Sequence, residues 1–125
     1  MTTPTLMTAT AFKGTGSVLV KFDFDGPVPR TGTFLVGIFG ARDNPYLQLQ
    51  FGLKLLDGEQ IAYFINDTHH QVNFEGEVPI IDPTTIAVPY PLSRFDELGP
   101  GATYRAYVNY EGRDFQTDVP VQFEG

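Results

Sequence analysis

Residues 46–66 read YLQLQFGLKLLDGEQIAYFIN, and this stretch decides the fold class. From Leu47 to Leu55 every odd position is large and apolar, and the positions between are polar residues or glycine. A period of two predicts a β-strand with one buried and one solvated face. Asp57-Gly58 then favours a type I′ turn, and Glu59–Asn66 returns as a second β-prone run. The apolar residues that alternate in this return are Ile61, Tyr63 and Ile65. We therefore expect an antiparallel hairpin.

Similar short patterns recur at intervals of about ten residues, separated by Gly, Pro and Asp turns. They cover Ser17–Asp25, Thr33–Gly40, Gln71–Phe74, Val78–Ile81, Thr84–Val88, Thr103–Glu111 and Asp114–Phe123. Glu111-Gly112 is expected to form a two-residue turn like that at Asp57-Gly58. The pattern predicts an all-β fold, an antiparallel two-sheet β-sandwich of the jelly-roll or immunoglobulin-like kind with about eight short strands.

The sequence also predicts the N-terminal segment, the bounds of the domain and one short helix. Residues 1–16 lack sustained alternation, and we interpret them as an extended N-terminal arm with a short edge strand near residues 9–12. Residues 17–125 then form a single sandwich domain, since a chain of 125 residues has the usual length of one domain. At most one helical turn is expected, at residues 93–98, where Ser93 can cap the start and Gly99-Pro100 stops it.

Prolines indicate where hydrogen-bonded ladders end, because proline has no N–H to donate. The segments around Pro79, Pro89 and Pro91 are therefore expected at a sheet edge or at strand ends. Pro120 marks its segment as an edge as well.

Composition narrows the classes of partner. The chain has no cysteine, which excludes disulfides, thiolate metal sites and cysteine catalysis. Its net charge of −7 opposes binding to nucleic acid or to an anionic membrane. The N-terminus has no basic region followed by an apolar run, so we expect no signal peptide and synthesis in the cytoplasm.

The sequence contains few candidates for metal-binding or catalytic residues. Asp23 and Asp25 lie two residues apart on one strand face and are the best metal candidates, since Ca²⁺ prefers carboxylate oxygens. The alternative is a solvated face whose charge opposes edge-to-edge pairing. Neither Ser17 nor Ser93 lies in a Gly-x-Ser-x-Gly elbow. We expect no enzyme activity and no cofactor.

The polar face of the inner strands is the candidate binding surface. Its residues are Gln48, Gln50, Arg105, Tyr107 and Asn109. If their strands share a sheet, they form a flat platform of amides around an aromatic ring, which suits either sugars or a protein partner. The alternatives are a face that is merely solvated, or a Tyr107 buried beneath a loop.

The second half of the chain contains a series of pieces in a recognisable order. They are Leu-Asp-Gly-Glu at 56–59, Ile-Ala-Tyr-Phe-Ile-Asn-Asp at 61–67, Thr-Ile-Ala-Val-Pro-Tyr-Pro-Leu-Ser at 85–93, Leu-Gly-Pro-Gly at 98–101 and Thr-Tyr-Arg-Ala-Tyr-Val-Asn-Tyr at 103–110. This order resembles bacterial jelly-roll sandwiches of the carbohydrate-binding-module-9 and DOMON-like kind. The resemblance covers about half of the chain and implies a non-catalytic sandwich, with sugar binding or a cofactor pocket in some members. It carries over no functional residue, because the chain has no Trp for a sugar clamp and both methionines, Met1 and Met7, lie in the expected arm.

The sequence therefore predicts two alternative functions. The first is a non-enzymatic structural or interaction module, an accessory or decoration subunit of a larger assembly such as a phage particle, which docks on a protein partner through the N-terminal arm. The second is a carbohydrate-binding module that holds a glycan on the Gln48, Gln50, Arg105, Tyr107 and Asn109 face.

Overall fold

The computed structural model describes residues 4–43, 45–67, 70–73 and 80–124. This part of the chain contains ten strands and one short helix. Their bounds are β1 Leu6–Lys13, β2 Ser17–Phe24, β3 Thr33–Arg42, β4 Leu47–Leu56, β5 Glu59–Asn66, β6 Gln71–Asn73, β7 Ile80–Ile81, β8 Thr85–Pro91, α1 Leu92–Leu98, β9 Thr103–Tyr110 and β10 Arg113–Glu124. The all-β prediction is confirmed, with more strands than the eight expected. Phe74, Val78 and Pro79, which belong to the segments expected around β6 and β7, lie outside the described residues.

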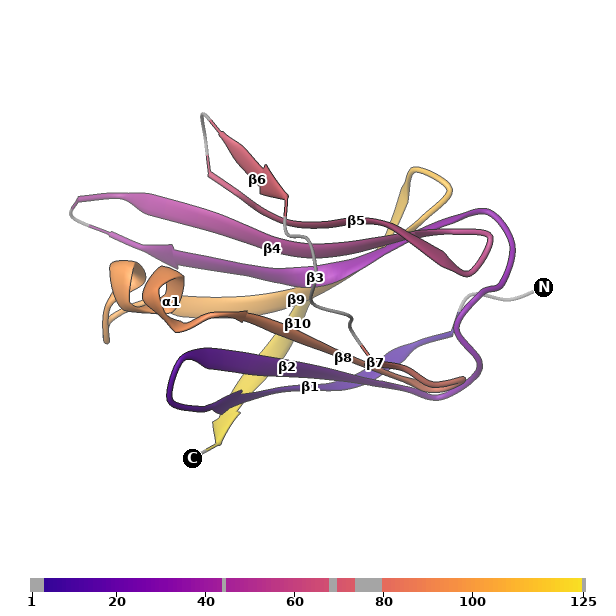
Figure 1. Cartoon of the computed structure of the whole chain (residues 1–125), viewed down its shortest axis with the longest axis horizontal. Helices are drawn as coiled ribbons and strands as arrows, with labels where there is room; N and C mark the ends of the chain where they lie inside the picture. Colours follow the sequence, from indigo (N-terminus) through magenta and orange to yellow (C-terminus); the bar gives the residue numbers. More distant parts are fainter. Residues whose placement is uncertain (1–3, 44, 68–69, 74–79, 125) are drawn as a thin grey trace.

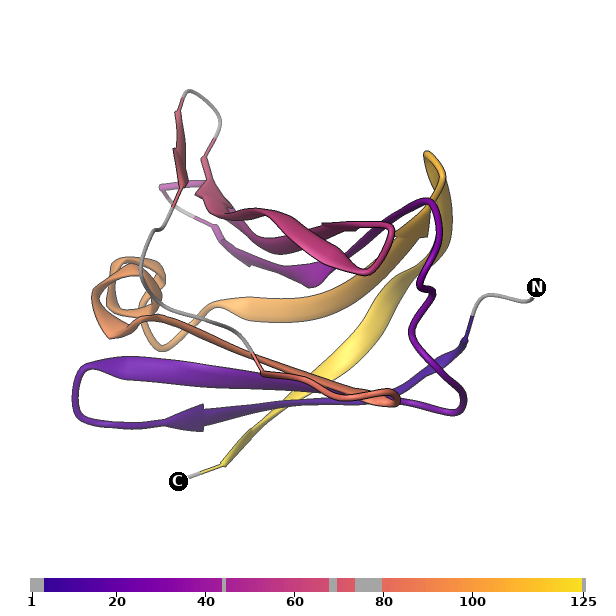
Figure 2. The same cartoon turned by 45° about the vertical axis from the view of Figure 1, so that its right-hand side comes forward.

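All ten strands belong to one continuous sheet, in the order β6-β5-β4-β3-β9-β10-β1-β2-β8-β7. The sheet curls so that β3, β4, β5 and β9 lie over β1, β2 and β8 (Figures 1 and 2). The predicted pair of separate antiparallel sheets is therefore replaced by a half-barrel, whose two halves still pack face to face. The sheet is mixed, because β1 and β10 run parallel.

β10 is the strand that joins the two halves. From Arg113 to Pro120 it pairs antiparallel with β9, and from Val121 to Glu124 it pairs parallel with β1. Two register shifts in its pairing with β9 indicate bulges, which bend a strand and increase its twist. The sequence predicts Pro120 at an edge. It lies instead in the sheet interior, where β10 changes partner and the ladder is interrupted in any case.

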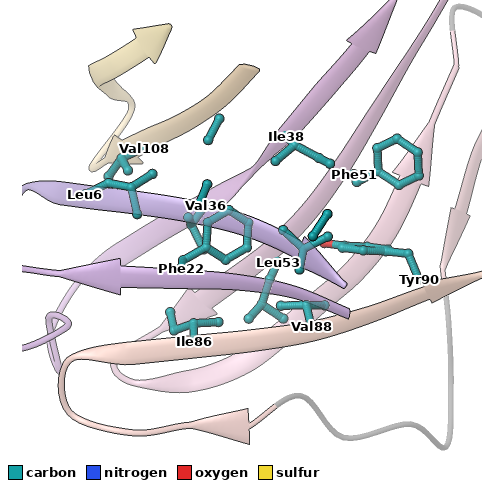
Figure 3. Close-up of a cluster of buried hydrophobic side chains, with 14 of the residues drawn as sticks. Leu6, Phe22, Val36, Ile38, Phe51, Leu53, Ile86, Val88, Tyr90 and Val108 are labelled. Carbon is teal, nitrogen blue, oxygen red and sulfur yellow. The ribbon is translucent and has the colours of Figure 1, made fainter. Parts of the chain in front are cut away.

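The core fills the space between the two halves (Figure 3). The predicted inward rows of β2 and β4 are buried: Val18, Val20, Phe22, Phe24, Leu49, Phe51, Leu53 and Leu55. Aromatic pairs cross from one half to the other, with ring centroids 5.8 Å apart for Phe24 and Phe34 and 5.2 Å apart for Phe51 and Tyr90. Both pairs meet edge to face, an arrangement that aromatic rings favour. The period of two in the sequence therefore identified the core faces of β2 and β4 correctly.

Both predicted two-residue turns are present. The φ angles are 50° at Asp57 and 83° at Gly58, and they are 52° at Glu111 and 79° at Gly112. These positive pairs are what a type I′ turn requires. The loop before β3 is held against the first turn, because the Gly32 N–H donates to Asp57 Oδ1 over 2.8 Å and the Asp57 N–H donates to the Gly32 carbonyl over 2.9 Å.

The N-terminal segment is part of the sheet rather than a separate arm. β1 lies between β2, with which it pairs antiparallel, and the end of β10, with which it pairs parallel. Ala9 and Ala11 are 1% and 0% exposed and form the inward row with Leu6. Alanine is too small to produce a clear apolar alternation in the sequence, which explains why the pattern did not predict an interior strand.

The helix is longer than expected and starts differently. α1 has seven residues, roughly two turns, and its N-cap is Pro91, with no capping side chain from Ser93. It ends as predicted at Gly99, whose φ is 79°. Arg42 donates to the Glu97 carbonyl and so satisfies an acceptor at the end of the helix.

α1 covers one end of the half-barrel (Figure 2). Phe95 and Leu98 are its buried residues. Leu98 fits over Gly40 of β3, where an added Cβ would lie 2.6 Å from Leu98 Cδ1.

The prolines of β8 lie where the sequence predicted. β8 pairs along its length with β2, but on its other side β7 reaches only Ile86 and Ala87. β8 is the second strand from the end of the sheet, and Pro89 and Pro91 lie beyond its short pairing with β7. The missing N–H groups of these prolines therefore interrupt no ladder between described strands.

Candidate functional site

The five residues of the predicted binding surface all lie on one surface, the outward side of β3, β4, β5, β6 and β9, which we call the outer face. Their strands are neighbours, because β3 pairs with β4 on one side and with β9 on the other. In one cross-strand row Phe39 lies between Gln50 and Arg105. The Arg105 guanidinium lies over the Phe39 ring, 5.2 Å from its centroid, in a cation–π contact.

Tyr107 does not present its ring to a ligand. It is only 4% exposed, and its centroid lies 4.6 Å from that of Phe39. Its hydroxyl accepts a hydrogen bond from Gln50 Nε2 over 2.9 Å and donates one to the Phe51 carbonyl over 3.4 Å. Burial raises the pKa of Tyr107, and the hydrogen bond from Gln50 opposes this shift. The expected aromatic anchor is therefore a structural residue of the sheet.

Two glycines explain how Tyr107 becomes buried on an outward face. Gly37 and Gly52 are direct cross-strand partners at the centre of β3 and β4. A Cβ added at Gly37 would lie 2.6 Å from Tyr107 Oη, and one added at Gly52 would lie 2.4 Å from Phe64 Cζ. The rings of Tyr107 and Phe64 thus occupy the space that two side chains would otherwise fill.

Tyr46 is a well-exposed aromatic side chain of this region, with an exposed fraction of 63%. Its hydroxyl donates to Gln48 Oε1 over 2.7 Å, so the ring is tethered to the outer face. Asn109 is tethered as well, because its Nδ2 donates to Asp114 Oδ1 over 2.9 Å. Tyr46 immediately precedes the alternating run of β4, and its exposure could not be read from the pattern.

A cluster of amide side chains extends from the predicted residues across β5 and β6. Gln50 is the cross-strand partner of Asn66, and Asn66 is the partner of Gln71. Gln48 and Asn73 lie two positions away from Gln50 and Gln71 on the same strands, and hence on the same face. We call these five residues the amide cluster. Each amide offers both donors and an acceptor, so the cluster can match ligand hydroxyl groups.

A bulge in β5 brings the amide cluster together. A regular hairpin that starts with the Leu56–Glu59 pair would place Gln50 opposite Ile65. The register shifts between Lys54 and Leu55, however, and Gln50 faces Asn66 instead. Ile61 is the extra residue, and it is 53% exposed although Tyr63 and Ile65 are buried. A turn motif alone cannot predict such a shift.

The central rows of the outer face differ in charge from the rest of this acidic chain. The described outward residues from Gln48 to Lys54, with their cross-strand partners on β3 and β9, carry two cations, Lys54 and Arg105, and no carboxylate. The formal net charge of the whole chain is −7. A row of residues without carboxylates adds no local repulsion toward an acidic partner.

The two aspartates considered for a metal have separate hydrogen-bonding roles. Asp23 accepts hydrogen bonds from the Thr8 hydroxyl over 3.2 Å and from the Thr85 hydroxyl over 3.1 Å, which links β2 to both of its neighbours. Asp25 accepts from the Thr5 N–H over 2.7 Å. Within residues 4–43, 45–67, 70–73 and 80–124 there is no group of three or more potential metal ligands.

The hydroxyl groups of two buried tyrosines give a prediction for stability. Tyr90 Oη is fully buried, has no hydrogen-bond partner among the described residues, and burial raises its pKa well above the ordinary value. Tyr90→Phe should increase the free energy of unfolding by about 1 kcal/mol, because it removes an unsatisfied polar group and keeps the ring. Tyr107→Phe is the matched control and should decrease it by about 1 kcal/mol, because Gln50 loses its acceptor. Urea denaturation of both variants measures these changes, and shifts of the same sign would contradict the assignment.

Comparisons with protein-family models, with curated proteins and with solved structures find no match for this chain. The resemblance to carbohydrate-binding-module-9 and DOMON-like sandwiches therefore stays a prediction. No helix in the described part of the chain is long and apolar enough to cross a membrane.

Proposed function

We propose that this chain is a non-enzymatic interaction module that binds its partner through the outer face, as an accessory subunit of a larger assembly such as a phage particle. The observation that carries the proposal is the amide cluster, which lies beside a row without carboxylates on a strongly acidic chain. Amides bind uncharged polar groups without the large desolvation cost of burying charges. Tyr46 and Arg105 belong to residue types that often anchor protein interfaces.

In this proposal docking does not use an N-terminal arm, because residues 6–13 pair with strands on both sides. The outer face replaces the arm as the contact surface. A sheet face with tethered side chains loses little conformational entropy on binding, which favours docking on a preformed surface.

Carbohydrate binding is the second candidate, and the five amides of the cluster support it specifically. Sugar hydroxyl groups both donate and accept hydrogen bonds, as amides do. Tyr46, rather than Tyr107, would supply an exposed ring for the C–H face of a sugar.

The experiment compares a Tyr46→Ala/Gln71→Ala variant with Gln122→Ala. Both Gln71 and Gln122 are exposed amides, but Gln122 pairs with Thr10 in the opposite half of the sheet. Co-purification with a particle in fixed stoichiometry should be lost in the first variant and retained in the second. Saturable glycan-array binding with the same dependence would favour carbohydrate recognition instead. If neither activity depends on Tyr46 and Gln71 while both variants melt like the parent protein, the proposed role of the outer face is wrong.

A further inference from the structure

A groove of about 590 Å³ lies at the end of the half-barrel where α1, β9 and β10 meet, away from the outer face. Figures 1 and 2 show α1 and the end of β10 on the same side of the molecule. Phe95, Tyr104 and Phe123 line the groove. Ring centroids are 4.8 Å apart for Tyr104 and Phe123 and 5.9 Å apart for Phe95 and Tyr104. The three rings therefore form one continuous aromatic wall.

Part of this wall is open to solvent. Phe95 is 4% exposed and anchors α1 to the core, where its ring stacks on Phe51 with centroids 4.5 Å apart. Phe123, by contrast, is 39% exposed. Its ring meets that of Phe95 edge to face, with centroids 6.5 Å apart, and the rest of the ring stays accessible. Such a ring offers a π-face, which carries partial negative charge.

The charges around the groove favour a cation. Asp96 and Glu124 line it, and Lys13 is the one basic residue among its described lining residues. Gly99, at the end of α1, lines it as well. Burial, and then the negative charge of Asp96, raise the pKa of the Tyr104 hydroxyl, which agrees with a negative potential near this ring.

We propose that this groove binds an alkylammonium cation of the choline type, held by the π-faces of Tyr104 and Phe123 and by the carboxylates of Asp96 and Glu124. A quaternary ammonium is bulky and has no N–H groups that need hydrogen-bond acceptors, so it suits the aromatic wall, and the carboxylates at the rim of the groove add attraction for its positive charge. The site is independent of the outer face, and neither proposal depends on the other.

The test compares choline with its neutral isostere 3,3-dimethylbutan-1-ol by following backbone amide shifts of residues 95–104 and 121–124 in NMR titrations. Choline should bind roughly tenfold more tightly than the alcohol, because only the cation gains the interaction with the rings and carboxylates. Phosphocholine should bind more weakly than choline, since its phosphate meets Asp96 and Glu124. Phosphocholine binding that equals or exceeds choline binding would indicate a lipid headgroup and would contradict the role of the carboxylates.

Two variants separate the cation effect from simple apolar binding. Phe123→Leu keeps an apolar side chain and should reduce the preference for choline, whereas Phe115→Leu, at an exposed phenylalanine near the other end of β10, should leave it unchanged. Asp96→Asn changes an exposed residue and should weaken choline several-fold without affecting the alcohol, which keeps the test valid if Phe123→Leu does not fold. Equal affinities for choline and the alcohol in the parent protein, or an unchanged preference in both groove variants, would overturn the proposal.

Discussion

A chain that lacks residues 1–16 should not fold cooperatively. The deletion removes β1, the strand that pairs with β2 on one side and with the end of β10 on the other. Because β1 connects β2 to β10, its removal separates the sheet into two parts at the point where it curls. The buried row of β2 is then no longer held against the other half of the sheet. Unpaired ladder groups and exposed apolar rows also promote aggregation. Circular dichroism and thermal melting of the truncated chain should show no sharp transition.

A pair of point variants tests the same conclusion without shortening the chain. Ala11 is 0% exposed on the inward side of β1, whereas its neighbour Phe12 is 40% exposed on the outward side. Ala11→Asp buries an unpaired charge and should reduce stability by roughly 3 kcal/mol or more. Phe12→Asp places the same carboxylate in solvent and should shift stability by less than about 1 kcal/mol. A truncated chain that melts sharply, or equal effects of the two variants, would contradict the interior position of β1.

Gly37→Ala should be the most damaging methyl addition in the sheet, with a loss of about 3 kcal/mol or more. The new Cβ would lie 1.9 Å from the Phe51 carbonyl oxygen and 2.6 Å from Tyr107 Oη. The first of these atoms belongs to the backbone of the neighbouring strand, so the clash can be relieved only by separating β3 from β4. Overpacking that forces side chains off their rotamers and shifts the backbone typically costs about 1–3 kcal/mol and occasionally more, and we expect Gly37→Ala at the upper end because the nearest atom is a backbone oxygen. Equilibrium denaturation gives the change directly.

Two further glycine variants test whether a steric clash of the added Cβ is the cause of such a loss of stability. Gly101→Ala is the control, because a Cβ there would meet nothing within 4 Å, and it should be neutral or stabilise by up to about 1 kcal/mol. At Gly52 the nearest atoms all belong to the Phe64 ring, so Gly52→Ala should be coupled to Phe64→Leu in a double-mutant cycle, with less loss in the double variant than the sum of the single ones. Additive effects would show that Phe64 does not lie over Gly52.

The sequence was informative wherever local chemistry decides the structure. The alternation of β2 and β4 identified the inward rows, and the Asp57-Gly58 and Glu111-Gly112 pairs adopt the positive φ angles that such turns require. These features depend on one residue and its immediate neighbours. They could therefore be predicted without knowing which strands meet.

The candidate site was predictable only in part. Gln48, Gln50, Arg105, Tyr107 and Asn109 share a face because they alternate with core residues on strands that β3 joins. The burial of Tyr107 depends on the pairing of Gly37 with Gly52, which is a property of two strands rather than of one. Asn66, Gln71 and Asn73 join the amide cluster only because a bulge shifts the register of β5. The aromatic groove combines α1 with the ends of β9 and β10, segments for which the sequence shows no common pattern.

The residue order alone determined that the protein is built from strands, which side of most strands faces the core, and where the tight turns fall, because side-chain direction in a strand reverses at every residue. Only the tertiary structure decided that the strands form one curled sheet, that residues 6–13 lie in its interior, and which polar side chains gather on its surface. Strand pairing is set by contacts between distant segments and by bulges such as those of β10, and no local pattern encodes which partner a strand will find.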